Sequence, residues 1–101
     1  MALTYRFSEE LWLYPGDGAW YFITLPVEYA KEIKTIISPM KRGFGSAKVV
    51  ATIGNTTWHT SIFPDSTSKS YLLPIKKEIR NKNNLHLHEN IEVEISIVGV
   101  E

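Results

Sequence analysis

The chain has 101 residues, of which 44% are hydrophobic and 22% are charged. These proportions are typical of a soluble globular protein, and the length predicts a single domain over residues 1–101. Basic and acidic residues number 11 each, so the formal net charge is zero, which argues against a dedicated nucleic-acid-binding protein. The absence of cysteine excludes disulfides, thiolate metal ligands and cysteine nucleophiles. The sequence shows no signal-peptide pattern and no apolar run long enough to span a bilayer, so we expect a cytoplasmic protein.

Two strands joined by a turn are predicted at the start of the chain. Residues 3–14 are rich in aromatic and β-forming residues, although the acidic pair Glu9-Glu10 interrupts the pattern and suggests a bulge or a sheet edge. A Pro-Gly-Asp-Gly turn follows, because proline presets φ and glycine accepts positive φ. The returning strand, residues 19–25, is apolar on both faces.

An amphipathic helix is predicted after Pro26, which fits the first helical position because its missing N–H is not needed there. Isoleucines fall on one stripe of this helix, and Lys31 and Lys34 fall on the solvated side. The helix is expected to end at Ser38-Pro39, because the residue before a proline is disfavoured in the helical region.

A β-hairpin is predicted in the middle of the chain. Residues 47–53 alternate apolar side chains, Gly54-Asn55 is a turn signal, and residues 56–63 form the returning strand. Residues 64–68 are expected to form a loop.

A second strand–helix–strand unit is predicted in the last third of the chain. Residues 70–73 form a short strand, and Pro74 is expected to open a short helix over residues 75–82. Asparagines at 83–84 end that helix. The final strand, residues 91–97, alternates isoleucine and valine with glutamate and serine, which is typical of a half-buried strand.

The two halves of the chain echo one another. Residues 22–33 read FITLPVEYAKEI and residues 71–79 read YLLPIKKEI, and each is a strand, Leu-Pro and an amphipathic helix. The sequence therefore predicts a mainly β protein: a double-split β-barrel of about six strands with two short helices and a pseudo-twofold internal repeat. Because one chain supplies both halves, we expect a monomer.

Residues 73–95, LPIKKEIRNKNNLHLHENIEVEI, resemble the repeating unit of AbrB-like swapped-hairpin transcription regulators and antitoxins. In those proteins two chains interleave to form one double-split barrel. This sequence differs in carrying both halves itself, and in having Glu89-Asn90 where Gly-Asp is usual. Asparagine tolerates the left-handed conformation that such a turn requires.

Over residues 3–98 the sequence is similar to the bacterial domain-of-unknown-function family numbered nineteen-oh-five. Four motifs carry this resemblance, in the order LWLYPGDGAWYFITLP, RGFGSAKV, GNTTWHTSIFP and YLLPIKKEIR. The resemblance implies a small double-split β-barrel. It implies no activity, since a fold alone does not supply a function.

The stretch KRGFGS, residues 41–46, has the composition of a phosphate-binding loop. A phosphate loop lies between a strand and a helix N-terminus, whereas this stretch follows a helix and precedes a strand. The glycines are therefore interpreted first as a bend. The second interpretation is an anion site, in which Arg42 and exposed glycine N–H groups hold a small anion or a phosphate.

The three tryptophans, Trp12, Trp20 and Trp58, are expected in the core, because each can bury on the order of 200 Å². A partly exposed tryptophan beside Arg42 would instead stack on a planar ligand. The candidate ligand-binding residues are Arg42, Gly43, Phe44, Gly45, Ser46, Trp12, Trp20 and Trp58.

The polar candidates for metal binding or catalysis are weaker. His86 and His88 share a face of an extended segment and His59 lies elsewhere, but solvated histidines explain them better than a metal does. The row Thr57, His59 and Ser61 has no carboxylate placed to orient the imidazole. The remaining carboxylates, Glu9, Glu10 and Asp17, do not form a close catalytic pair. We therefore expect no catalytic residues, no metal and no cofactor.

The concentrated basic run at residues 76–82 offers an alternative. AbrB-like regulators contact DNA through basic residues of the barrel, and the matching positions here are Lys76, Lys77 and Arg80. A solvated helix face is the ordinary explanation. The sequence favours a non-enzymatic binding or interaction domain that uses the Arg42–Ser46 loop, with a small anionic or planar ligand or a protein partner; weak nucleic-acid binding is the alternative.

Overall fold

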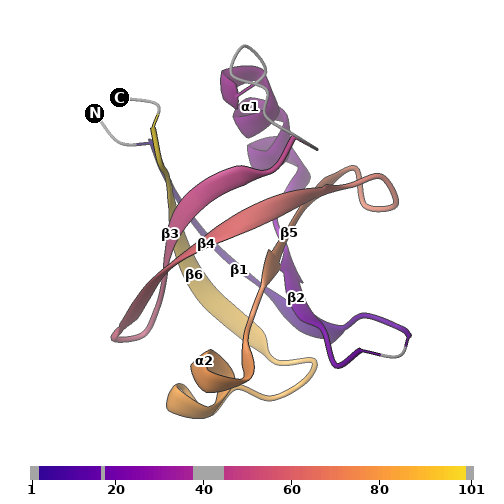
Figure 1. The fold of residues 1–101 in the computed structure, drawn as a ribbon, viewed down its shortest axis with the longest axis vertical. Coiled ribbons are helices and arrows are strands. Elements are labelled where there is room, and N and C mark those ends of the chain that lie inside the picture. Colours follow the sequence, from indigo (N-terminus) through magenta and orange to yellow (C-terminus); the bar gives the residue numbers. More distant parts are fainter. Residues whose placement is uncertain (1–2, 17, 38–44, 100–101) are drawn as a thin grey trace.

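The computed structural model describes residues 3–16, 18–37 and 45–99, and within them six antiparallel strands close into a barrel with two helices (Figure 1). This confirms the mainly β barrel with two short helices that the sequence predicts. In chain order the elements are β1 (Leu3–Leu13), β2 (Tyr21–Thr24), α1 (Val27–Ile37), β3 (Ala47–Ile53), β4 (Thr56–Asp65), β5 (Ser70–Pro74), α2 (Lys77–Lys82) and β6 (Asn90–Ile97).

The order of strands around the barrel has a twofold character. It reads β1-β2-β5-β4-β3-β6. If β1 is exchanged with β4, β2 with β5 and β3 with β6, every pair of neighbouring strands in this order is recovered. The junction of β2 and β5 repeats this relation in its hydrogen bonds. The N–H of Leu25 donates to the carbonyl of Tyr71 (3.0 Å), and the N–H of Ile75 donates to the carbonyl of Tyr21 (2.9 Å). The internal repeat is therefore built into the topology.

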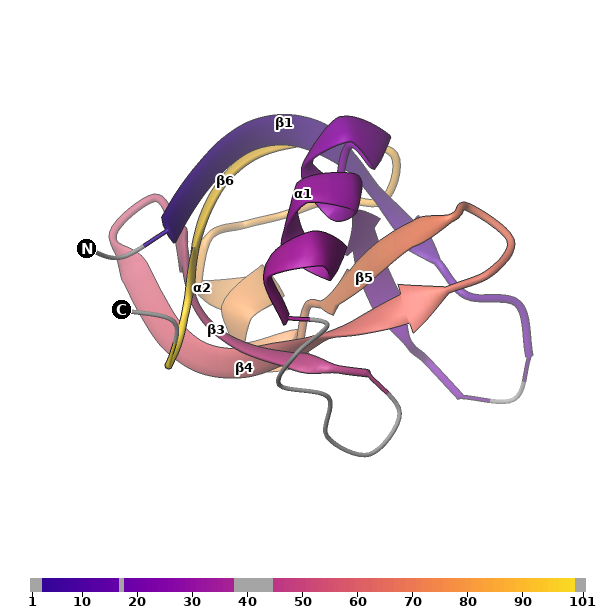
Figure 2. The ribbon, with the colours of Figure 1, turned by 90° about the horizontal axis from the view of Figure 1, so that it is seen from above.

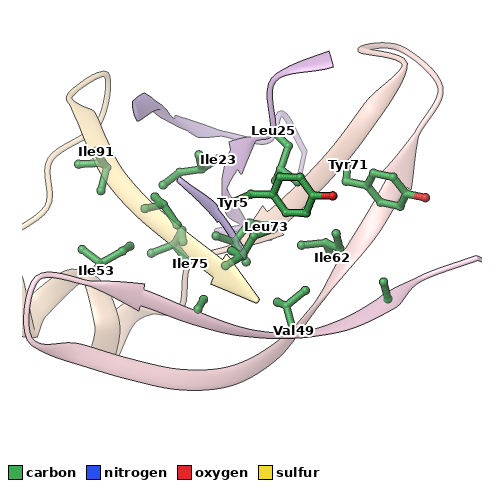
Figure 3. Close-up of a cluster of buried hydrophobic side chains, with 14 of the residues drawn as sticks. Tyr5, Ile23, Leu25, Val49, Ile53, Ile62, Tyr71, Leu73, Ile75 and Ile91 are labelled. Carbon is green, nitrogen blue, oxygen red and sulfur yellow. The ribbon is translucent and has the colours of Figure 1, made fainter. Parts of the chain in front are cut away.

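The barrel interior is filled by alternate residues of the strands. Ile23, Val49, Ile62 and Leu73 come from four different strands and are fully buried (Figure 3). Burying each such side chain contributes about 1.5–3 kcal/mol. The period of two along the strands thus separates a continuous core from an outer face.

Helix α1 lies over one end of the barrel, and α2 lies at the opposite end (Figures 1 and 2). The carbonyl of Pro26 accepts the N–H of Ala30 (3.0 Å), which makes Pro26 the residue before the first turn; α1 begins at Val27, one residue later than predicted. The Tyr5 hydroxyl donates to Glu32 of α1 (2.9 Å), and the Tyr5 and Tyr29 rings lie 5.2 Å apart. Neither described helix is long and apolar enough to cross a membrane.

The expected bulge at the acidic pair is wrong. Strand β1 pairs with β6 in one unbroken register from Leu3 opposite Ile97 to Glu10 opposite Asn90. Immediately afterwards β1 leaves β6 and pairs with β2, beginning with Leu11. The pair Glu9-Glu10 therefore marks a change of neighbouring strand, and the closed barrel has no edge there.

Two proline positions also differ from expectation. Strand β4 continues through Pro64 to Asp65, because its pairing with β3 ends at Ile62 and a proline is tolerated where only one neighbour remains. Pro74 ends β5 rather than opening α2. Lys76 has an extended conformation (ψ 157°), so the helix begins one residue later, at Lys77.

Candidate functional site

A cleft of about 1300 Å³ opens at the end of the barrel that α1 covers. Its walls come from α1, the first residues of β3, the end of β4, the turn into β5 and the end of β6. Segments far apart in the sequence meet here because the barrel closes and brings the strand ends under the helix (Figure 2). This volume exceeds the range of about 300–1000 Å³ that is usual for small-molecule sites, so the cleft has room for a small-molecule ligand.

Lysines dominate the charge of the cleft. Lys31 and Lys34 come from α1, Lys48 from β3 and Lys69 from the turn before β5. These are four of the eight lysines in a chain whose formal net charge is zero. Within the described part of the chain, Asp65 is the one acidic residue in the lining. Charge of one sign is therefore concentrated in a concavity, where it attracts anions.

The single carboxylate is tied into the wall of the cleft. Asp65 accepts hydrogen bonds from the backbone N–H (3.0 Å) and the hydroxyl (2.7 Å) of Ser68. The next residue, Lys69, has a positive φ of 57°. The carboxylate thereby fixes the turn that carries one of the four lysines.

The deep part of the cleft is apolar with hydroxyl groups. Ser70 is buried and donates to the carbonyl of Leu25 (2.7 Å). Tyr71 is only 5% exposed, and its hydroxyl forms no hydrogen bond with any residue that the structure describes. Burial raises the pKa of Tyr71 above the ordinary 10.0, so the phenol stays protonated at neutral pH and can donate to a ligand.

The predicted loop is only partly described. Gly45 and Ser46 line the cleft, and Gly45 has φ +83°, which agrees with glycine being used for a bend. Arg42, Gly43 and Phe44 lie outside the described residues.

The three tryptophans do not gather in the core. Trp20 is 60% exposed and lies just before β2, and Trp12 lies on β1 opposite Phe22 on the outer face. The β1–β2 turn beside them projects from the part of the barrel away from α1 (Figure 1). Trp58 alone packs against the core, where its indole N–H is buried without a hydrogen-bond acceptor among the described residues. Trp12 and Trp20 therefore do not line the cleft.

The basic residues of the alternative hypothesis lie on or beside α2. Lys76 and Lys77 are exposed, whereas Arg80 is held in place. Its guanidinium carbon lies 3.7 Å from the centre of the Tyr21 ring, and Nη1 donates to the carbonyl of Ile75 (2.9 Å). One of the three cations is therefore used to attach the helix.

The polar candidates are spread over the outer surface. Thr57, His59 and Ser61 share the outer face of β4, where Thr57 and His59 are exposed and Ser61 lines the cleft. The Thr57 hydroxyl forms a hydrogen bond with that of Thr52 (3.0 Å). His88 hydrogen-bonds through Nδ1 to Glu10 (2.5 Å). No group of three possible metal ligands occurs within residues 3–16, 18–37 and 45–99.

Local sequence patterns did not identify the cleft. Lys31 and Lys34 have the spacing of a solvated helix face, and they do face solvent, but over a concavity. Lys48, Lys69 and Tyr71 carry no local signal, because only barrel closure brings them together.

These observations define the class of protein. It is a small six-stranded antiparallel barrel with two helices and a lysine-lined cleft at one end. Residues 7–95 match the family described as Domain of unknown function (DUF1905), and the chain belongs to that family. This confirms the family resemblance found in the sequence. No curated protein matches the chain.

Proposed function

We propose that the protein is a non-enzymatic binding domain that holds a small anionic ligand with an apolar or planar body in the cleft beside α1. The observation that carries the proposal is the convergence of Lys31, Lys34, Lys48 and Lys69 on one concavity of an otherwise neutral chain. The lysines supply attraction for the anion. The apolar depth, with the Tyr71 hydroxyl as a donor, accommodates the body.

The titratable groups of the cleft suit the binding of a ligand better than the catalysis of a reaction. The buried Tyr71 phenol, whose pKa is raised, stays protonated at neutral pH, and Asp65 accepts hydrogen bonds from Ser68. A general base within reach of a reacting proton is what catalysis would require. The described lining thus offers recognition of charge and shape.

Thermal unfolding in the presence of phenyl phosphate, inorganic phosphate or phenol tests the proposal. Phenyl phosphate combines an anion with a planar body, and the other two probes carry one feature each. At a hundred times its dissociation constant, phenyl phosphate should add about 2.7 kcal/mol to the free energy of unfolding. Phosphate and phenol should add less.

A charge-matched pair of double variants locates the effect. Lys34→Met with Lys48→Met removes two cleft lysines, and Lys76→Met with Lys82→Met removes two lysines near α2. The first should abolish the shift and the second should preserve it. Absence of any shift with phenyl phosphate, or an equal loss in both variants, would contradict the proposal.

Weak nucleic-acid binding through Lys76, Lys77 and Arg80 is the second candidate, and it comes from the resemblance to AbrB-like barrels. Fluorescence anisotropy with a labelled DNA duplex, measured as a function of salt, distinguishes the two. Binding through phosphates requires affinity that falls as salt rises. Undetectable binding at low salt, or binding with no salt dependence, would reject this candidate.

A further inference from the structure

A cluster of aromatic rings lies on the outer face of β1 and β2, away from the cleft. Trp12 and Phe22 are opposite each other in the β1–β2 pairing, Tyr14 lies two residues beyond Trp12, and Trp20 lies two residues before Phe22. The same face therefore carries all four rings, which we call the aromatic platform. Neighbouring ring centres in the platform are 5.7–6.2 Å apart.

The most exposed ring of the platform is held in a defined position. The Trp20 indole stacks on Phe22 with an interplanar angle of 9°. A Cβ added at Gly18 would come within 2.6 Å of Trp20 Cδ1, so the indole lies directly against the glycine backbone. Trp20 is nevertheless 60% exposed and Tyr14 is 48% exposed. Contiguous exposed aromatic surface of this kind marks a binding surface.

A hollow of about 270 Å³, lined by Glu9, Glu10, Trp12 and Thr24, adjoins the platform. The Trp12 N–H donates to the Thr24 hydroxyl (2.9 Å), which fixes the indole beside the Glu10 side chain on the outer face of β1. Glu9 lies opposite the buried Ile91, so its side chain is on the other face of the strand. Glu9 forms no ion pair or side-chain hydrogen bond within the described part of the chain, and Glu10 contacts only His88 there. The described lining of the hollow contains no cation.

We propose that the aromatic platform and this hollow bind a polypeptide partner through an arginine side chain. A guanidinium is attracted to aromatic faces and forms charge-assisted hydrogen bonds with carboxylates, so the hollow matches it in both respects. The platform beyond the hollow, with Trp20 and Tyr14, offers apolar surface to the residues that flank the arginine. A closed barrel has no free strand edge, so the partner lies across the face rather than extending the sheet.

The charges argue against other occupants. A nucleic acid could stack on the rings, but its phosphates would meet Glu10. A neutral sugar could stack as well, but would leave Glu10 with His88 as its one partner among the described residues. The platform is also distinct from the proposed anion site, which lies at the α1 end of the barrel (Figure 1).

Two peptides that differ only in charge test the proposal. Acetyl-Leu-Arg-Leu-amide carries the guanidinium, and the matched peptide with citrulline in place of arginine carries a neutral group of the same shape. Heteronuclear NMR follows the indole N–H signals, which Trp→Phe variants assign. The arginine peptide should shift the signals of Trp12 and Trp20 and leave that of Trp58 unchanged. The citrulline peptide should bind at least about fivefold more weakly than the arginine peptide.

Variants separate the roles of charge and platform. Glu10→Gln should remove the preference for arginine over citrulline, whereas Glu9→Gln, on the opposite face of β1, and Glu92→Gln, an exposed carboxylate on β6, should keep it. Gly18→Ala keeps every aromatic ring but displaces Trp20, and should weaken both peptides. The cleft variant Lys34→Met with Lys48→Met should bind the arginine peptide like the natural protein, so the two proposals fail independently. Thermal unfolding establishes that each variant is folded.

Three outcomes would overturn the inference. These are no response to the arginine peptide, equal affinity for the two peptides, or a preference that survives Glu10→Gln. A response of the same indoles to maltotriose in place of the arginine peptide would instead identify a sugar site and reject the polypeptide partner.

Discussion

At the scale of single residues, Gly54 connects the two halves of the barrel. It lies in the β3–β4 turn with φ +57°, and an added Cβ would lie 2.9 Å from Oδ1 of Asn83. Asn83 caps α2 and also donates to the Thr56 hydroxyl (3.1 Å). The β3–β4 turn, which joins the two halves, thereby lies against the C-terminus of α2.

Substitution of Gly54 by alanine should lower the free energy of unfolding by about 1–2 kcal/mol, because it adds both backbone strain and a close contact. Gly99→Ala is the matched control, since Gly99 has φ +84° but open space around it. Urea denaturation of both variants measures the difference. Equal losses would show that the contact with Asn83 contributes nothing.

Tyr5 makes stability depend on pH at the alkaline end. Burial, then the hydrogen bond to Glu32, then the charge of Glu32 raise the pKa of Tyr5 from 10.0 to about 12. The unfolded chain releases this proton near pH 10, so the stabilisation is complete below pH 10 and is lost as the pH rises through 12. Between these values we expect the free energy of unfolding to fall by up to about 2 kcal/mol.

Tyr5→Phe isolates this effect, because the variant keeps the other alkaline titrations, including that of Tyr71. The difference in free energy of unfolding between the natural protein and Tyr5→Phe should shrink from pH 9 to pH 12. Urea denaturation at several pH values measures it. A constant difference over this range would contradict the assignment.

At the scale of elements, α2 is a helix of six residues and has little stability of its own. Arg80 holds it through the Tyr21 ring and the Ile75 carbonyl. Arg80→Ala should therefore cost about 1–2 kcal/mol, whereas Lys77→Ala, at an exposed position, should change stability by less than about 0.5 kcal/mol. Chemical denaturation compares them. Equal small effects would leave Arg80 free for a nucleic-acid role.

Which side faces the core was predictable from sequence for strands with one apolar face, but not for strands with two. Strand β6 alternates cleanly, so Ile91 and Ile95 face the core as the pattern requires. Residues 19–25 are apolar on both faces, so the pattern could not say that Ile23 faces inward while Trp20 is left in solvent. Helix α2 was found but placed too early, because proline also fits the end of a strand.

The candidate site was less predictable than the fold for a physical reason. Secondary structure depends on neighbours in sequence, whereas the cleft depends on which strand ends meet after closure. Lys34 and Lys48 lie on different elements and share no motif. Among the residues that line the cleft, only Gly45 and Ser46 were selected in advance as ligand-binding residues, and Ser61 was considered only as part of a polar row on β4.

At the scale of the molecule, the twofold order of strands makes the β3–β4 turn equivalent to the gap between β6 and β1. The ends of the described chain lie beside each other, with Leu3 opposite Ile97. A circular permutant that begins at Thr56 and joins the old ends by a short Gly/Ser linker should fold into the same barrel. We expect the free energy of unfolding to fall by about 1–3 kcal/mol, because the linker replaces the β3–β4 turn as the connection between two neighbouring strands.

Circular dichroism and urea denaturation of the permutant check this expectation. A control permutant opened between Leu72 and Leu73 interrupts β5, which has no equivalent break in the other half, and should not fold. If the two permutants behave alike, the repeat in strand order does not govern how the chain folds.

The side-by-side placement of β1 and β6 also determines how the protein responds to mechanical load. Leu3 and Ile97 form the first residue pair between β1 and β6 (Figure 1). Tension applied through the neighbouring segments of the chain therefore acts on this pair first, and the hydrogen bonds between the strands break in succession rather than together. We expect a barrel with this attachment to begin opening at the end that α1 covers, where Ile97 lies.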